Sequence, residues 1–250
     1  MDFSRMFRNI PVVTKNLIII NVLIWVAMTV LSPRIGVKVD DLFGLHYFSS
    51  TLFNPAQLFT YMFMHASFTH LFFNMFALFM FGMTLEHVLG SKRFLFYFIS
   101  CGIGAALIQE GVYAFFINDY LDKLPADVIG IIKNQGAEII SQGMNYTDPD
   151  MGGLNALFNG CTIGASGAVY GILLAFGVLF PNQPIYLMFI PIPIPSKYFV
   201  IGYGVIELLQ GLSRSAGDNV AHFAHLGGML VGLAIILYWK KKGTIYGGFY

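Results

Sequence analysis

Charged residues are scarce in this sequence. Lys and Arg contribute 14 residues and Asp and Glu contribute 13, so only 11% of the 250 residues carry a charge. Soluble domains carry roughly 25% charged residues. In addition, 56% of the chain is hydrophobic and the mean hydropathy is +0.69. This composition excludes an ordinary water-soluble domain and indicates a protein of the lipid bilayer.

Net charge and cysteine are also low. A formal net charge of +1 provides no basic surface for nucleic acid, which we therefore exclude as a partner. The two cysteines, Cys101 and Cys161, lie within or beside apolar runs, so a disulfide framework is not expected. We expect the protein to need neither a cofactor nor a metal.

Six apolar segments approach the roughly 20 residues that a membrane-spanning helix needs. The first is not followed by a small-residue cleavage site, so we expect it to be retained as a span. The fifth is short and contains Glu207. The sequence therefore predicts an all-α polytopic membrane protein with a single membrane domain over residues 1–250. The spans are expected at about 16–33, 68–89, 93–116, 161–181, 197–213 and 220–239.

A polar stretch at about 117–160 separates the third and fourth spans. Within it, the segment DVIGIIKNQGAEII (127–140) has apolar residues at helical spacing. This pattern predicts an amphipathic helix, which lies either on the membrane surface or against the bundle.

The distribution of Lys and Arg predicts the orientation. With the N-terminus in the cytoplasm, nine of these residues fall inside and five outside, as expected from the enrichment of positive charge on the cytoplasmic side. We therefore expect a multi-pass protein with both termini in the cytoplasm. The basic N-terminal segment is short and lacks the character of a transit peptide, so the bacterial inner membrane is expected rather than a mitochondrial one. The insert at 117–160 then lies outside the cytoplasm.

Four polar side chains are expected at one depth near the outer side. Ser166 and His225 are each the sixth residue of a predicted span, which places them roughly 8–9 Å below its outer edge. His70 and Asn74 lie near the outer start of the second span. Ionisable groups inside a membrane are costly and usually functional, although a single buried histidine is also explained by a structural hydrogen bond.

Glycines recur at helical spacing on the fourth and sixth spans. Small residues at such positions let two helix backbones approach closely, which would bring Ser166 and His225 within hydrogen-bond reach. Helix packing alone also explains the pattern. The glycines concerned are Gly164, Gly167, Gly171, Gly228 and Gly232.

A serine paired with a histidine can perform acyl transfer. Serine becomes a good nucleophile when a base removes its proton, and His225 can act as that base and later protonate the leaving amine. No Asp or Glu lies within one or two turns of His225 in its own span. We therefore expect a Ser–His dyad without an acidic third member.

Other side chains are candidates for support of this dyad. Tyr170 lies at i+4 from Ser166, so its ring is placed either against His225 or toward lipid. His70 and Asn74 are also spaced i, i+4 and offer N–H donors for an oxyanion, together with the backbone amides of Ala165 and Ser166. The alternative for Asn74 is a structural partner on another helix.

Several motifs, in this order, resemble the rhomboid intramembrane serine proteases. They are HLFFN with His70 and Asn74, GMTLEHVLGSKRF with Gly82, Glu86, Gly90 and Ser91, GASG with Ser166, PIYLMFIPIPIPSK, and AHLGGMLVG with His225. The resemblance covers about 50–240.

This resemblance implies a fold and a site. It implies a six-helix bundle around a short fourth helix, with Ser166 and His225 as the catalytic dyad. It also implies oxyanion donors at His70, Asn74 and the Ser166 backbone, with Gly164 and Ala165 in support and Tyr170 stacked near the histidine. Substrates of the family are single-span membrane proteins, cut in or near the span. The fifth span and the loop at about 211–220 would form a gate and cap.

The sequence departs from the family in two places. Many bacterial rhomboids have a Trp-Arg pair in the first outer loop, where this chain has Ala56-Gln57. The insert at 117–160 is also longer than in compact members. We therefore expect this loop to be anchored differently.

Two other functions fit parts of the pattern. One is a catalytically inactive rhomboid-like protein that binds membrane clients, although both dyad residues are present. The other is a metal site or transporter that uses four histidines near one membrane face. A transport path would usually include a carboxylate in the spans, and we expect none to join these histidines. His225 is preferred to His222 as the base because the glycine pattern follows it. The four histidines are His65, His70, His222 and His225.

Overall fold

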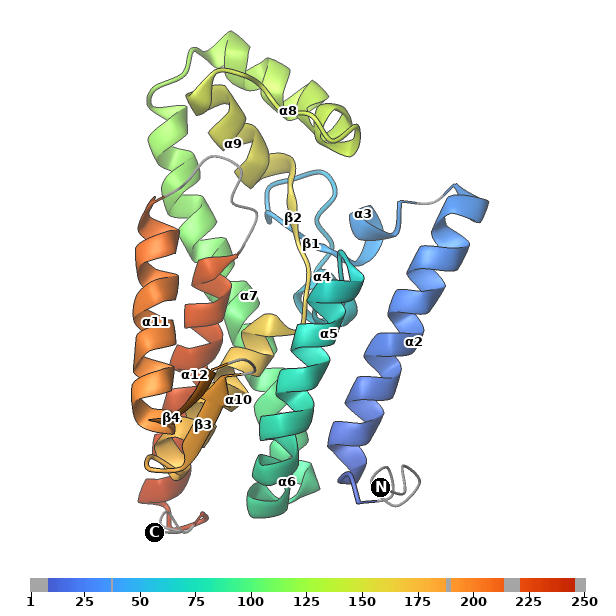
Figure 1. The fold of residues 1–250 in the computed structure, drawn as a ribbon. Helices are drawn as coiled ribbons and strands as arrows, with labels where there is room; N and C mark the ends of the chain where they lie inside the picture. Colours follow the sequence, from blue (N-terminus) through green and yellow to red (C-terminus); the bar gives the residue numbers. More distant parts are fainter. Residues whose placement is uncertain (1–8, 37, 188–189, 214–220, 246–250) are drawn as a thin grey trace.

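The computed structural model describes residues 9–36, 38–187, 190–213 and 221–245. The described chain is a bundle of helices that run side by side, with α8 (Ala126–Ser141) and α9 (Pro149–Asn159) over one end. The first described long helix begins, and the last one ends, at the opposite end of the bundle (Figure 1). The protein is therefore a helical, polytopic membrane protein, as the sequence predicts.

The helices and strands follow one another along the chain. The helices are α2 (Val12–Ile35), α3 (Val39–Phe43), α4 (Gln57–Thr60), η1 (Tyr61–Phe63), α5 (Phe68–Ala77), the π-helical η2 (Leu78–Gly82), α6 (Met83–Leu89), α7 (Ser91–Leu121), α8 (Ala126–Ser141), α9 (Pro149–Asn159), α10 (Ser166–Leu179), α11 (Ser196–Ser213) and α12 (His222–Lys241). The strands are β1 (Leu45–His46), β2 (Cys161–Thr162), β3 (Pro184–Leu187) and β4 (Ile190–Pro195). Strands β1 and β2 pair antiparallel, as do β3 and β4.

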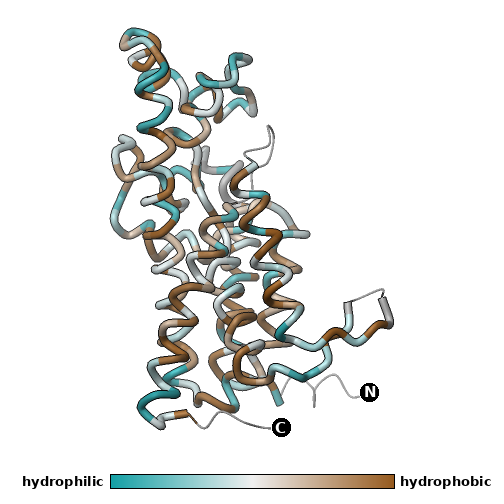
Figure 2. Tube along the Cα trace, turned by 90° about the vertical axis from the view of Figure 1, so that its left-hand side faces the viewer, coloured by the Kyte–Doolittle hydropathy of each residue, from teal (hydrophilic) through white to brown (hydrophobic). Residues whose placement is uncertain are grey.

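Four described helical segments are long and apolar enough to cross a membrane. They are Val12–Val30, Phe68–Leu89, Ser91–Leu121 and His222–Lys241. The exposed outer faces of the bundle remain apolar, with Leu23, Ile201 and Leu230 each about 60% exposed or more. Bands of hydrophobic residues follow the long helices, whereas hydrophilic residues lie toward both ends of the bundle (Figure 2).

The predicted fourth span at 161–181 is only partly helical. Helix α10 has 14 residues and begins at Ser166. Residues 161–165 before it are not helical, because Cys161 and Thr162 pair with β1 and Gly164 has a φ of 131°. Glycine has no Cβ and is therefore the residue that tolerates this backbone conformation. Similarly, α12 begins at His222, whereas residues 214–220, which include most of the predicted cap, lie outside the described residues.

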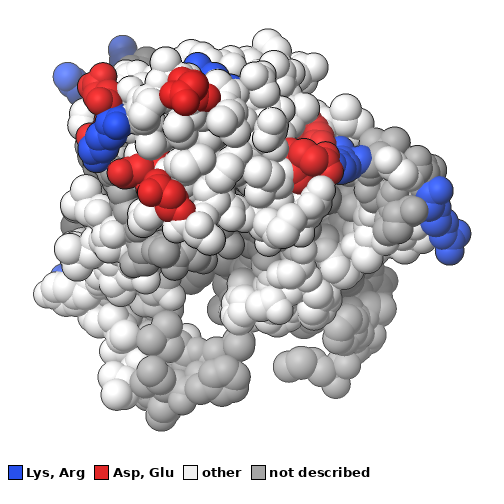
Figure 3. All heavy atoms as spheres, turned by 90° about the horizontal axis from the view of Figure 1, so that it is seen from above, with Lys and Arg blue, Asp and Glu red and all other residues white. Residues whose placement is uncertain are grey.

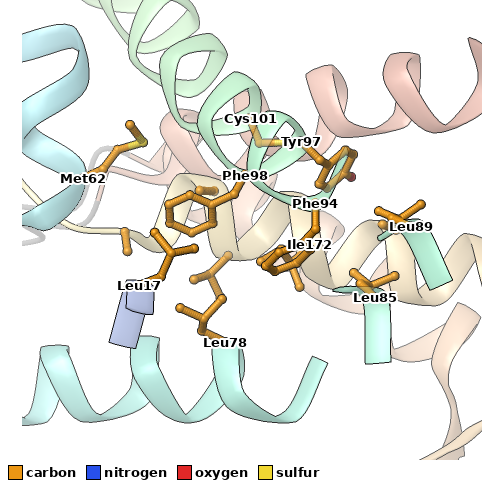
Figure 4. Packing of buried hydrophobic residues seen from close by; sticks show 14 of the residues in the cluster. Leu17, Met62, Leu78, Leu85, Leu89, Phe94, Tyr97, Phe98, Cys101 and Ile172 are labelled. Atoms are coloured by element: carbon orange, nitrogen blue, oxygen red, sulfur yellow. The ribbon is translucent and has the colours of Figure 1, made fainter. Parts of the chain in front are cut away.

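The core lies where α10 packs between α7 and α12. Phe94 of α7 lies beside Ile172 of α10, whereas Phe98 points toward Leu17 of α2, and these phenylalanines and Ile172 are fully buried (Figure 4). Leu78 and Leu85 enter the same cluster from the second span. This apolar layer fixes the position of α10 and therefore of the residue at which α10 begins.

Glycines allow α10 and α12 to approach backbone to backbone. A Cβ on Gly228 would overlap the carbonyl oxygen of Gly167. A Cβ on Gly171 would lie 2.6 Å from Cys101 Sγ and 3.0 Å from the carbonyl oxygen of Gly228. A Cβ on Gly232 would overlap the hydroxyl of Tyr97, which belongs to α7. The close approach predicted from the glycine spacing is therefore present.

Gln57 anchors the first outer loop from within. Its side chain is 1% exposed, and its amide nitrogen donates to the carbonyl oxygens of Asp41, Leu42 and Leu52 at 2.9–3.3 Å. Its amide oxygen accepts from the backbone amides of His46 and Asn54. One neutral side chain thus ties together this loop.

The insert folds against the extended end of α7. Helix α8 covers the predicted amphipathic segment, and its apolar side buries Ile132 against a small cluster with Ile117, Leu154 and Phe158. Asn159 of α9 donates to the carbonyl oxygen of Ile132 at 2.9 Å. Helix α8 thus packs on the protein through this side, and its placement relative to the membrane surface stays a prediction. Seen from this end, acidic and basic side chains are interspersed (Figure 3).

Candidate active site

Ser166 is the first residue of α10 and is reached by the non-helical segment 161–165 (Figure 1). The amide of Gly164 donates to the carbonyl oxygen of Tyr61 at 2.9 Å and holds this segment in place. The first amides of a helix have no intrahelical acceptor, and the helix dipole makes this end partially positive. The hydroxyl of Ser166 therefore lies beside amides that favour a developing negative charge.

His225 meets Ser166 from the facing helix. It is the fourth residue of α12, and its Nε2 lies 2.8 Å from Ser166 Oγ. The side chain of His225 is 9% exposed. The close backbone contact between Gly228 and Gly167 brings the first turns of α10 and α12 to this distance.

Tyr170 covers one face of the imidazole. The rings of Tyr170 and His225 stack with centroids 4.2 Å apart and an interplanar angle of 4°. Because the two rings come from different helices, this contact restricts rotation of the His225 ring. Of the two placements considered for Tyr170, the structure shows the one against His225.

Glu207 of α11 contacts the other side of His225, which the sequence analysis did not anticipate. Its Oε2 lies 2.9 Å from His225 Nδ1 and 2.6 Å from His222 Nδ1. The hydroxyl of Tyr170 donates to its Oε1. The expectation that no acidic residue joins His225 is therefore wrong, because the carboxylate comes from a different helix. An available signal was that a lone acid inside an apolar span is costly and needs a partner.

His70 lies beside the serine, whereas Asn74 is engaged within its own helix. A Cβ placed on Gly164 would lie 2.8 Å from two atoms of the His70 ring and 3.6 Å from Ser166 Oγ. The amide nitrogen of Asn74 donates to the carbonyl oxygen of His70 at 2.9 Å. An amide group has two hydrogens, so one remains for another acceptor. The oxyanion roles of His70, Asn74 and the backbone of Ala165 and Ser166 stay predictions.

The four histidines considered for a metal form two separate pairs. His65 and His70 have ring centroids 5.1 Å apart, and His222 and His225 have centroids 6.3 Å apart. Burial, together with the neighbouring His70, lowers the pKa of His65 to about 4, so His65 is neutral near pH 7. Among the described residues, Glu207, His222 and His225 form the group whose ligand atoms lie within 4.8 Å of one another. A carboxylate thus joins two of the four histidines, contrary to expectation, and hydrogen bonds link all three side chains.

The fold and the site define a polytopic helical membrane protein that holds a serine hydroxyl against an imidazole at the start of a short inner helix. The sequence matches the Rhomboid domain over residues 53–120 and 127–242, so the chain belongs to the rhomboid family. This finding confirms the resemblance seen in the motifs. At the level of the family, it supports an intramembrane protease.

Two relatives show the range of the similarity. Rhomboid protein 1, mitochondrial, of Saccharomyces cerevisiae is 25% identical over 185 residues, which cover 72% of this chain and 40% of the relative. Rhomboid protease AarA of Providencia stuartii is 26% identical over 231 residues, which cover 89% of this chain and 70% of the relative. The chain thus spans less than half of the yeast protein's length and about two thirds of the bacterial one's.

Proposed function

We propose that this protein is an intramembrane serine endopeptidase that hydrolyses peptide bonds in or near the transmembrane segments of membrane proteins. The observation that carries the proposal is the 2.8 Å contact between His225 Nε2 and Ser166 Oγ. This contact joins a nucleophile to a base inside a membrane-spanning bundle. The peptide bonds of soluble proteins do not reach such a site.

The reaction proceeds in two acyl-transfer steps. Ser166 Oγ attacks the carbonyl carbon of the scissile bond while His225 Nε2 takes the hydroxyl proton. The imidazolium then gives this proton to the leaving amine, which departs as the bond breaks and leaves an acyl ester on Ser166. Water attacks the ester with His225 again as base, which releases the acid and restores Ser166.

Donors beside Ser166 stabilise the oxyanion that forms in each step. The amides at the start of α10 and the imidazole of His70 lie next to the hydroxyl, and Asn74 is one helical turn from His70. Such preorganised donors each contribute roughly 10²–10³-fold to the rate in acyl transfer.

The substrates proposed are single-span membrane proteins, and the site opens away from the cytoplasm. Ser166 is reached by the segment that descends from the α8–α9 end (Figure 1). The positive-inside distribution of Lys and Arg places this end outside the cytoplasm. The bacterial inner membrane is the proposed location.

The decisive test is cleavage of a reporter transmembrane substrate by the full chain and by Ser166→Ala. We expect the rate to fall at least about 1,000-fold, because removal of the nucleophile leaves only binding and oxyanion stabilisation. A fluorophosphonate probe should label the wild-type protein and not Ser166→Ala. Thermal unfolding in detergent checks that both proteins are folded. Equal cleavage by the two folded proteins would contradict the proposal.

A further inference from the structure

The carboxylate of Glu207 accepts three hydrogen bonds, one of them from the imidazole that faces Ser166. Its Oε2 lies 2.9 Å from Nδ1 of His225, on the opposite side of the ring from the 2.8 Å contact with Ser166. The same oxygen lies 2.6 Å from His222 Nδ1, and the hydroxyl of Tyr170 donates to Oε1. The side chains of Glu207, His222 and His225 are 7–9% exposed.

This geometry determines where the protons of His225 lie. An ionised carboxylate only accepts hydrogen bonds, so each imidazole nitrogen that contacts it must carry a hydrogen. With its hydrogen on Nδ1, a neutral His225 presents the lone pair of Nε2 to the hydroxyl of Ser166. The contact with Glu207 thus selects the tautomer that can act as a base.

The arrangement also compensates the cost of a buried charge. A carboxylate inside a membrane protein is costly unless hydrogen bonds replace its hydration. Three donors surround Glu207, and they come from α10 and α12, whereas the acid itself comes from α11. When His225 takes the proton of Ser166, the adjacent negative charge stabilises the imidazolium.

We propose that Glu207 is a positioning residue for His225 and completes a Ser166–His225–Glu207 triad in which the acid comes from a separate helix. The inference rests on the proposed function. Glu207 does not take the proton itself; it remains ionised, while the proton moves from Ser166 Oγ to His225 Nε2 and on to the leaving amine. His222 contacts the same carboxylate oxygen as His225 and helps to fix its position.

The test compares two substitutions at one position in the full chain. Glu207→Asp keeps the negative charge but is shorter by one methylene, whereas Glu207→Gln keeps the shape but can donate a hydrogen to Nδ1 and so favour the inactive tautomer. We expect kcat of Glu207→Gln to fall about 10²–10⁴-fold with KM changed less than about threefold, as for the amide substitution in a Ser–His–Asp triad. Glu207→Asp should retain more of kcat than Glu207→Gln.

The opposite order would overturn the inference. If Glu207 only ties α11 to the bundle, the isosteric Gln should be tolerated at least as well as the shorter Asp, in both kcat and thermal stability. The matched control is Glu138→Gln on α8, because this acid has a side chain 68% exposed and should tolerate the same change at the wild-type rate.

Two further measurements separate this inference from its alternatives. Loss of cleavage in Ser166→Ala with wild-type kcat in Glu207→Gln would refute the triad and leave the protease intact, whereas cleavage by Ser166→Ala would refute both. Metal analysis of the purified, active protein is the second measurement. One equivalent of a transition metal on Glu207, His222 and His225 would overturn the triad, since the metal would occupy the Nδ1 that the carboxylate is proposed to hold.

Discussion

At the scale of single residues, Ser166, His225 and Glu207 form one connected set of side chains in the candidate site. Ser166 and His225 could be found because a hydroxyl and an imidazole in apolar spans, each followed by spaced glycines, form a recognisable pattern. Glu207 could not be connected to His225 in this way, because the contact joins residues 18 positions apart on two helices. Spacing reports which residues share one helix face, whereas contacts between helices depend on how those helices rotate and pack.

The role of Asn74 is testable by its removal. If its second amide hydrogen stabilises the oxyanion, Asn74→Ala should lower kcat roughly 10–1,000-fold, with the lower value allowing for help from His70. The measurement is the initial rate of reporter cleavage at saturating substrate.

Asn21 provides a matched control for this substitution. It is also buried, and its amide nitrogen donates to the carbonyl oxygen of Leu17 four residues earlier, as that of Asn74 does to His70. Asn21→Ala should leave kcat unchanged. Equal rates for the two variants would mean that Asn74 has only the structural role within its helix.

At the scale of elements, α11 differs from the helices around it. Its described buried residues are Ser196, Val200 and Glu207, and much of its remaining surface is exposed and apolar. Val200 packs against Gly177 of α10, and Gly211 lies against Phe223 of α12. Glu207 thus provides the polar contact between these two points, so any displacement of α11 from α12 also separates the carboxylate from His225.

The approach of α10 to α12 can be tested with one methyl group. Gly228→Ala places a Cβ on the carbonyl oxygen of Gly167, which is backbone and cannot rotate away. We expect a destabilisation of about 1–3 kcal/mol, as for other overpacked sites, and slower fluorophosphonate labelling because Ser166 and His225 move apart. Thermal unfolding in detergent and the labelling rate measure the two effects.

Gly111→Ala on α7 is the control for this change. A Cβ at Gly111 meets no atom within 4 Å, so the substitution should be neutral or stabilise the helix by up to about 1 kcal/mol. If Gly228→Ala were as stable and as reactive as Gly111→Ala, close packing at Gly228 would not be required.

The element boundaries were only partly predictable. Hydropathy located an apolar run from Cys161 onward, but an apolar run does not distinguish extended chain from helix. The segment 161–165 is not helical because β2 finds a partner in β1, which is more than 110 residues earlier in the chain. The hairpin of β3 and β4 was likewise not anticipated, although its Pro-rich sequence argues against a helix.

At the scale of the whole molecule, composition was sufficient to predict the class and the helical bundle. The chain has few charges and long apolar segments, which predict that it lies in the membrane. Each segment is expected to be helical, because a helix satisfies its own backbone hydrogen bonds in lipid. The placement of the insert was not predictable, because an amphipathic helix presents the same pattern to lipid and to protein. Its position depends on contacts such as Asn159 with Ile132, which sequence periodicity does not report.

The orientation of the molecule predicts which end reacts with a membrane-impermeant maleimide. Ser141→Cys on α8 and Lys242→Cys after α12 are exposed positions at opposite ends of the bundle. In a Cys161→Ser background, Ser141→Cys should react in intact spheroplasts and Lys242→Cys only after lysis. Cys101 is fully buried and should stay unreactive. Labelling in the reverse order would invert the proposed orientation.

The position of Ser166 at the start of a short helix also bears on the membrane as an insulator. Helix α10 extends only about 21 Å beyond the serine, at 1.5 Å per residue over 14 residues, and its Ile172 belongs to a buried apolar layer with Phe94 and Leu85. A proton or sodium ion that crossed this apolar layer would lose its hydration at a cost of tens of kcal/mol. The proposed hydrolysis on one side of this layer would therefore not dissipate the electrochemical gradient across the bilayer.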